Sequence, residues 1–507
     1  MNATAQDISV YSEELKYCIA QKRCSRLLES FISYGDSIMG NDPDLLYVTP
    51  QCDPAAFSPG RKELLLSYKE AQQRHFFNAS PWVFHSSFDS NNNNDSKLNE
   101  NVQNFVSVTM DLKKKVKDFG NGVLPVESTI PDLFNLSDQQ LKCFNRIAES
   151  QTLWITIPLF SIAKQFFKFS HGLDQAFSNM SMNSLSNTAQ NQQSVGDLQR
   201  ELYLERASRT IQNSYRICLN DREPNIHVSK LCNVYCFINL NFAIYEKLQK
   251  SDLEKAYVKV LQDRILKNQL PDISNGTYSN FDRLWFNYFM GKHFISLNDL
   301  SKALPYLIES FDYCNIYCTT MFENIMNYLV PAYISHYQSV PHFILDNKVI
   351  PESWADFIKL LQKGDLRGIN LWIDTNELFL LQQNLMPIVK NIQDLCAARF
   401  LQKIWAINGK HWIIDSKEFA LLWKNTLNKD TEQNDAELMD LLAGKDNINE
   451  QVEAVNLDDL MDQAENIFAN LIAKRFLNGY ISHEKRKLVV SKTNPFPVFQ
   501  SRQVTPK

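Results

Sequence analysis

The C-terminal part of the chain constrains the fold most, because a long amphipathic pattern there leads directly into two short alternating segments. Apolar residues recur over residues 460–476 with the spacing of one helix face, and Asn456 is predicted to cap the start of this helix. Gly479 is predicted to end it, because glycine readily adopts the left-handed conformation that follows many helices. Residues 480–482 and 488–490 then have the pattern of a small β-hairpin. A helix that leads into a two-stranded ribbon is the end of a winged helix.

The preceding residues carry one helical pattern after another. Glycine is rare, at 14 of 507 residues, whereas Leu, Ile, Phe and Tyr are common, and this composition favours packed helices over loop-rich sheets. Residues 281–294 and 299–314 have the pattern of a helix–turn–helix pair, with the small residues Gly291 and Ala303 where crossing helices would approach closely. We therefore predict a mostly α protein, in which stacked tetratricopeptide-like (TPR-like) helical pairs end in a C-terminal winged helix with a small β-hairpin wing.

Changes in composition predict the parts of the chain. Asn-rich and Ser-rich stretches without periodicity indicate loops, and a run of acidic residues indicates an insert. The predicted parts are a poorly defined N-terminal region (1–130) with an Asn-rich loop (86–100), a helical-repeat domain (131–280) with a flexible loop (178–196), the helical part of the C-terminal domain (281–395), the winged helix (396–497) with an acidic insert (430–455), and a tail (498–507).

Charge is distributed unevenly near the C-terminus. The whole chain has a net charge of −5, so it is not a polycation adapted to nucleic acid. Residues 430–462 hold eleven acidic residues and one Lys, whereas residues 474–507 hold eight basic residues and one Glu. Cations on a wing can contact phosphates, which gives affinity without sequence preference. The candidate nucleic-acid contacts are Lys474, Arg475, Lys485, Arg486, Lys487 and Lys492. The alternative, solvated charge or a surface for protein pairing, stays open.

The sequence holds no recognisable catalytic, cofactor or metal motif. It lacks a Walker-type phosphate loop, a GxGxxG loop, an HExxH motif and any His-x-His pair. The pairs Cys232/Cys236 and Cys314/Cys318 lack CxxC spacing, so we interpret them as buried free thiols rather than zinc ligands. His483 is interpreted as a solvated turn residue. We expect no catalytic residue, no cofactor, no metal and no small-molecule substrate.

No membrane segment is expected either. The first 20 residues include acidic side chains and lack the apolar core of a signal peptide. The longest uncharged apolar stretch, residues 153–163, is about half of the ~20 residues that a membrane-spanning helix needs.

Four stretches of the sequence resemble one known family. They are CFNRIAESQTLWITIPLFSIAKQ (143–165), RTIQNSYRICLNDREP (209–224), FNYFMGKHF with KALPYLIESF (286–311), and NGYISHEKRKLVVSKTNPFP (478–497). Together they resemble the COP-nine signalosome subunit 12 family of PCI-domain proteins, which is related to the PCI subunit of the second transcription-and-export (TREX) complex. The last stretch is the most specific, and the resemblance covers roughly residues 136–497.

The resemblance implies a non-catalytic scaffold protein of the nucleus and cytoplasm. Such proteins pair their winged helix with that of another PCI-domain subunit and often hold a small acidic protein of the DSS/Sem type. One branch implies a signalosome-like complex whose output is cullin deneddylation. The other implies transcription-coupled mRNA processing and export, with contact to RNA or double-stranded DNA. A stand-alone winged-helix protein that binds nucleic acid is the alternative from another class.

Overall fold

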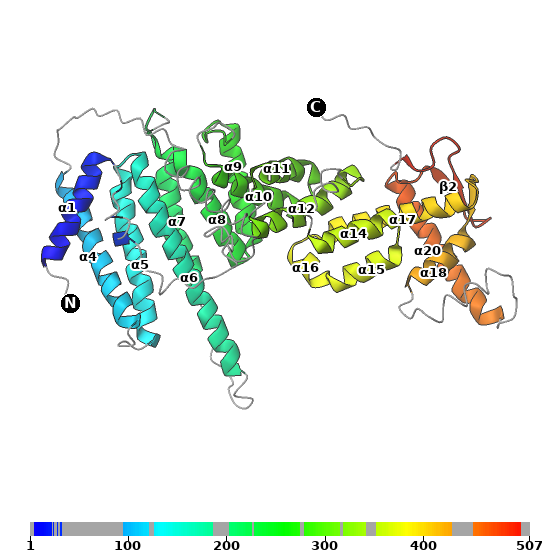
Figure 1. Ribbon diagram of the computed structural model, residues 1–507, viewed down its shortest axis with the longest axis horizontal. Helices are drawn as coiled ribbons and strands as arrows, with labels where there is room; N and C mark the ends of the chain where they lie inside the picture. The colour runs from blue at the N-terminus through cyan, green and yellow to red at the C-terminus, as the bar shows by residue number, and fades with distance from the viewer. Residues whose placement is uncertain are drawn as a thin grey trace, which may run out of the picture. The chain divides into compact units, whose positions relative to one another are not determined.

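The computed structural model of the protein is mostly helical (Figure 1). It describes residues 5–22, 24, 28, 31–32, 95–120, 126–185, 202–225, 228–273, 278–314, 318–340, 351–427 and 450–497. A small three-stranded antiparallel sheet lies near the C-terminus. The predicted fold class, helical pairs followed by a small β-containing module, is confirmed.

The described residues form two compact units, which are residues 1–290 with 309–321 and residues 291–308 with 322–507. The first unit contains α1 (Ala5–Gln21), α4 (Asp95–Gly120), α5 (Val126–Glu149), η2 (Leu153–Ile155), α6 (Thr156–Leu185), α7 (Tyr203–Leu219), η3 (Lys230–Asn233), α8 (Val234–Leu248) and α9 (Ser251–Leu266). Three helices contribute to both units, namely α10 (Asn280–Ser296), α11 (Leu300–Tyr313) and α12 (Thr319–Tyr337). The division into five parts made from the sequence stays a prediction.

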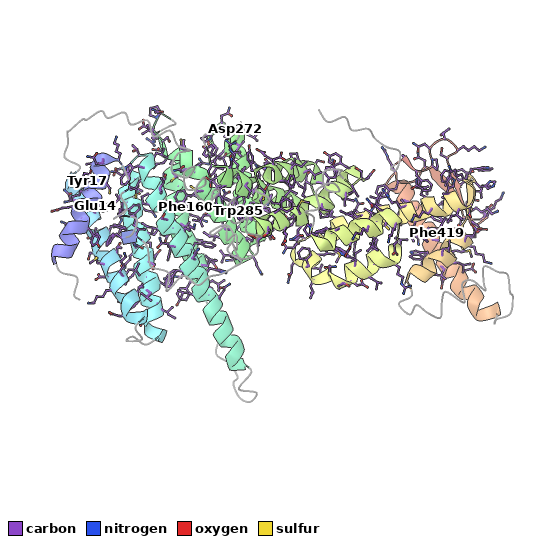
Figure 2. All side chains as sticks on the ribbon, in the orientation of Figure 1. Glu14, Tyr17, Phe160, Asp272, Trp285 and Phe419 are labelled. Atoms are coloured by element: carbon purple, nitrogen blue, oxygen red, sulfur yellow. The ribbon has the colours of Figure 1, made fainter. Side chains whose placement is uncertain are left out.

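Aromatic side chains fill the core of the first unit. Trp285 of α10, labelled in Figure 2, is 5% exposed, and its ring centroid lies 5.5 Å from that of Phe289. Phe289 in turn stacks on Phe242 of α8. Rings packed in this way bury large apolar areas, which accounts for the many aromatic residues at helical spacing in the sequence.

A buried lysine joins two helical layers of the first unit. Lys230 is 3% exposed, and its ammonium group donates hydrogen bonds to the backbone oxygens of Ala148 (3.0 Å) and Glu149 (3.2 Å). These are carbonyl groups at the C-terminal end of α5, which lack partners within the helix and carry the negative end of its dipole. The carboxylate of Asp221 lies 3.8 Å from the same ammonium group. Lys230 therefore caps the C-terminal end of α5.

The second unit ends in the winged helix. Its remaining elements are α14 (Glu352–Lys363), α15 (Leu366–Thr375), α16 (Glu377–Gln382), α17 (Met386–Ile407), β1 (Ile413–Asp415), α18 (Ser416–Leu427), α20 (Glu450–Ala473), β2 (Gly479–Ser482) and β3 (Lys487–Val490). The predicted hairpin is β2 with β3, and β1 adds a third strand, giving the order β1-β3-β2.

Three segments predicted as loops are partly helical. Helix α4 begins at Asp95 within the expected loop 86–100, α6 continues to Leu185 within 178–196, and α20 begins at Glu450 within the acidic insert 430–455. The helical parts of these three segments contain no Gly or Pro, which would disfavour a helix. They do contain Glu, Gln, Leu and Met, which favour a helix even in polar stretches. The remainder of each loop, residues 86–94, 186–196 and 430–449, lies outside the described residues.

No helix in the described ranges is long and apolar enough to cross a membrane. None of the nine cysteines that the structure describes forms a disulfide bond. Of the four predicted to be buried thiols, Cys232 is buried, whereas Cys236, Cys314 and Cys318 are half-buried. Burial raises the pKa of the Cys232 and Cys236 thiols, which keeps them protonated and makes them poor metal ligands.

The predicted close approach at Gly291 can be tested by substitution. A Cβ atom at Gly291 would lie 2.7 Å from the side chain of Leu307, which is fully buried. Gly291→Ala should therefore destabilise the protein by about 1–3 kcal/mol through overpacking. Gly172 in α6 is the matched control, because a Cβ there would meet nothing within 4 Å. Gly172→Ala should stabilise by about 0.5–1 kcal/mol. Chemical denaturation followed by circular dichroism measures both, and equal effects would contradict the packing assigned to Gly291.

Candidate interface on the winged helix

The winged helix is built on an aromatic core. Phe419 of α18, labelled in Figure 2, is fully buried between Phe400 of α17 (ring centroids 5.7 Å apart) and Phe468 of α20 (4.7 Å). Asp415 ends β1, and its carboxylate accepts a hydrogen bond from the backbone N–H of Lys417 in the first turn of α18 (3.0 Å). The sequence therefore ends a strand and starts a helix at adjacent residues, and Asp415 caps the start of α18.

Both ends of α20 differ from the prediction. Helix α20 begins six residues before Asn456 and ends at Ala473, so neither predicted cap is correct. Arg475, not Gly479, adopts the left-handed conformation that ends the helix (φ 59°). The N–H of Phe476 donates a hydrogen bond to the carbonyl oxygen of Leu471 at 2.9 Å.

Gly479 has a different role. It is the first residue of β2 and pairs with Val490 of β3. A Cβ atom at this position would overlap the backbone oxygen of Val489. Glycine is therefore required by the close approach of two strands and not by a helix end.

The proline-rich exit packs against α17. Phe496 is 4% exposed, and its ring centroid lies 5.6 Å from that of Trp405. The N–H of Asn478 donates to the backbone oxygen of Pro495 (2.8 Å), so the segment after β3 is held beside the segment before β2. This packing gives a structural role to residues 478–497, the stretch that carries the most specific family resemblance.

Two of the six predicted cations are engaged within the protein. Lys474 pairs with the carboxylate of Asp394 in α17 and donates a hydrogen bond to Asn391 (3.1 Å). Arg486 in the turn between β2 and β3 pairs with Asp462 and lies 3.3 Å from the carboxylate of Glu465, both in α20. These carboxylates, Asp462 first, raise the pKa of the Arg486 guanidinium, so its charge is constant.

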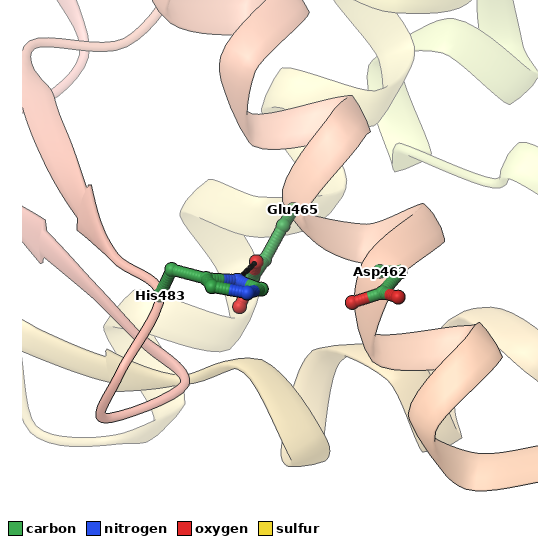
Figure 3. A group of neighbouring side chains, drawn as sticks. All are labelled: Asp462, Glu465 and His483. Atoms are coloured by element: carbon green, nitrogen blue, oxygen red, sulfur yellow. Dashed lines mark hydrogen bonds and ion pairs between the residues drawn. The ribbon is translucent and has the colours of Figure 1, made fainter. Parts of the chain in front are cut away.

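The turn between β2 and β3 is held on α20 by these contacts. His483 Nδ1 lies 2.7 Å from the Glu465 carboxylate, and Figure 3 shows His483 reaching from the turn to this side chain. The backbone oxygen of Arg486 also accepts from the N–H of Ser416 at 3.1 Å. His483 is thus hydrogen-bonded, although its side chain is 72% exposed, as expected of a turn residue. We call this group, Asp462, Glu465, His483 and Arg486, the wing latch.

The wing latch does not have the character of a metal site. Ligand atoms of Asp462, Glu465 and His483 lie within 4.8 Å of one another, which could suit a divalent ion. The guanidinium of Arg486, however, already forms ion pairs with both carboxylates. A metal ion would have to displace it, so no metal is assigned.

The other four predicted cations lie in surroundings that differ from those of Lys474 and Arg486. Lys485 and Lys487 are exposed on either side of Arg486, and Arg475 is exposed after α20. None of these three has an ion pair within the described part of the chain. The ammonium group of Lys492 lies 5.0 Å from the ring centroid of Trp412. The structure therefore leaves Arg475, Lys485 and Lys487 as the cations available to a ligand; their contact with nucleic acid stays a prediction.

The exposed surface of α20 is acidic. Asp458, Asp459 and Asp462 are exposed, and residues 450–473 include no Lys or Arg. In a helix–turn–helix the second helix enters the major groove of DNA, and here that helix is α20. Its charge would repel a duplex. From the sequence these aspartates were interpreted only as favourable charges near the positive end of the helix dipole, and their effect on a duplex was not recognised.

Sequence reasoning also missed exposed apolar residues on this module. Ile407, Trp412 and Tyr480 are 83%, 43% and 62% exposed. The signal was available for Tyr480, because the alternation of β2 places it on the face opposite Ile481, which packs inward with Leu488.

Comparisons with known proteins support the resemblance. No family model matches the chain. The chain is 27% identical over 422 residues to Cop9 signalosome complex subunit 12 of Saccharomyces cerevisiae, covering 78% of this chain and 88% of that protein. COP9 signalosome complex subunit 12 of Kluyveromyces lactis is 25% identical over 407 residues, with the same coverage. PCI domain-containing protein 2 of Danio rerio is 25% identical over 307 residues, which is 61% of this chain and 66% of the relative.

The two likenesses to subunit 12 proteins cover more than three quarters of the chain. Over most of its length the chain is therefore similar to COP9 signalosome subunit 12 proteins, and these likenesses support a PCI-domain protein of that family.

Proposed function

We propose that the protein is a non-catalytic scaffold subunit of a multiprotein complex, and that it pairs its winged helix with that of another PCI-domain subunit. The observation that carries this proposal is the exposure of Ile407 and Trp412 at the two ends of the connection between α17 and β1. Large apolar and aromatic side chains exposed on a folded module are typical of protein interfaces. The names of the relatives, which describe two of them as subunits of the signalosome, support membership in a complex.

Two complexes fit this role. One is signalosome-like, with cullin deneddylation as the output of the whole complex. The other acts in transcription-coupled mRNA processing and export. A small acidic protein of the DSS/Sem type is a further proposed partner, and the proposed location is the nucleus and cytoplasm.

Nucleic-acid contact is the second candidate function. It is favoured by Lys485 and Lys487, which are exposed and lack ion pairs within the described residues. Lys485 lies on the turn that the wing latch holds, and Lys487 begins β3 directly after that turn. The acidic surface of α20 argues against a stand-alone reader of duplex DNA. We therefore propose that any contact is made by the wing and is supplemented by cations of a neighbouring subunit.

Substitution of Ile407 tests the pairing. Ile407→Glu should lower recovery of the PCI-domain partner about 30-fold or more, which corresponds to loss of a central interface residue worth ~2 kcal/mol. The measurement is quantitative mass spectrometry of proteins recovered with the tagged full-length chain. Leu378→Glu is the matched control, because Leu378 in α16 is 77% exposed in the same unit. Equal recovery with both variants would contradict the use of this surface.

The same purification separates the two complexes. Recovery of a zinc isopeptidase subunit identifies the signalosome-like branch. Recovery of an export scaffold, nuclear-pore proteins or splicing factors identifies the mRNA branch.

The salt dependence of nucleic-acid binding tests the wing contact. With three available cations, log K should fall with log salt at a slope of about −2 for a single strand. Lys485→Gln combined with Lys487→Gln should reduce this slope by about 1.4. Lys474→Gln should leave it unchanged, because Lys474 is paired with Asp394. Fluorescence anisotropy of a labelled oligonucleotide measures the slope, and a value near that of the wild type for the double variant refutes the wing contact.

A further inference from the structure

The outward face of the three-stranded sheet carries an exposed apolar row. Val489 of the central strand pairs with Ile413 of β1 on one side and Tyr480 of β2 on the other. Directly paired residues of antiparallel strands point to the same face of a sheet. Ile414 and Leu488, which point the other way, are fully buried, so this row faces outward. Tyr480 lies on an edge strand and is 62% exposed.

A polar row lies next to the apolar one. Lys487 pairs with Ser482 of β2 and with Asp415 of β1, two residues along each strand. Tyr480 and Lys487 are thus diagonal neighbours on one face, a separation of about 7–8 Å that long side chains bridge. Lys485 lies in the adjoining turn and is exposed. The face therefore combines one exposed aromatic ring with nearby cations.

This combination has the chemistry that binds a single strand of nucleic acid. A base stacks on an exposed aromatic ring, and cations beside the ring contact the sugar–phosphate backbone. Charge complementarity favours such a ligand, because Lys485 and Lys487 have no ion pair within the described ranges while Asp415 already caps α18. A duplex cannot use the ring, because its bases are stacked on one another. The acidic surface of α20 also repels it.

The chemistry of Ser482 favours RNA over DNA. Its hydroxyl lies on the same face between Tyr480 and the turn, and no hydrogen bond to it is described within residues 450–497. A serine hydroxyl can donate to and accept from the ribose 2′-hydroxyl, which DNA lacks.

We propose that the outward face of the sheet binds single-stranded RNA, with one base stacked on Tyr480 and the backbone held by Lys485 and Lys487. This inference rests on the proposed contact of the wing with nucleic acid and gives it a ligand class and a stacking residue. The wing latch contributes by holding the turn, and hence both lysines, in a fixed position beside the ring. A protein partner is the competing occupant of the face, but protein interface cores are depleted in lysine.

Binding of a labelled RNA of about 12 nucleotides to the full-length chain tests the proposal. The probe is oligouridine at about 50 mM salt, where electrostatic contacts are strong enough to measure. Tyr480→Leu should weaken binding between about 5-fold and about 100-fold, as expected for loss of a base-stacking ring. Tyr480→Phe keeps the ring and should stay within about twofold of the wild type. Tyr17→Leu is the matched control, because Tyr17 is 59% exposed in the first unit.

Each outcome of these experiments supports or contradicts one part of the proposal. Thermal unfolding should be unchanged in Tyr480→Leu, since the side chain is exposed. Oligodeoxythymidine and a duplex of equal length should bind more weakly than the RNA, and equal binding by the DNA strand overturns the choice of RNA.

Weakening by Tyr480→Phe as large as by Tyr480→Leu overturns stacking. If lysine substitutions weaken binding and Tyr480→Leu does not, stacking fails and the wing contact stands. If the wild type does not bind, both fail. Loss of a protein partner in Tyr480→Leu without loss of RNA binding assigns the face to that partner.

Discussion

The pairing of Arg486 with Asp462 and Glu465 is the contact on which the winged helix surface depends. It joins the turn of a short hairpin to the middle of α20, and the carbonyl group of the same arginine receives the N–H that starts α18. A two-stranded hairpin is marginally stable by itself, so its position is fixed by what it packs against. One arginine therefore orients β2, β3 and the exposed residues they carry. Its charge is used inside the protein, and the neighbouring Lys485 and Lys487 remain available.

Most of the fold could be predicted from the sequence. Helical periodicity located the α10–α11 pair, and the short alternating segments located β2 and β3, because these patterns depend only on local geometry. The third strand, β1, was missed because three residues carry no periodic signal and its pairing partner lies more than 70 residues away. Helix ends were less predictable. A left-handed residue can end a helix without being glycine, as Arg475 does, and the glycine that follows served a close strand approach instead.

The candidate site could be predicted only as a list of cations. Sequence placed six basic residues near the wing but could not show that Lys474 reaches back 80 residues to Asp394, or that Arg486 reaches 24 residues back to Asp462. Such pairings depend on tertiary packing. The prediction from sequence considered only the charged residues and overlooked Tyr480. Side chains alternate between the two faces along a strand, so Tyr480 could be placed on the outward face once the strands were known. The acidic run was noticed, yet the exposed aspartates of α20 were not recognised as a surface that would repel nucleic acid.

The distribution of charge on this small module favours a shared role over an independent one. Three available cations give only a shallow salt dependence, and binding through so few phosphates is weak at physiological salt. The acidic surface of α20 and the net charge of −5 oppose any long-range attraction to nucleic acid. A scaffold subunit has no need of strong binding by itself, because a second subunit held next to it contributes its own contacts at high effective concentration. Under the proposed pairing, a partner bound at the exposed residues Ile407 and Trp412 would supply the affinity that the wing lacks.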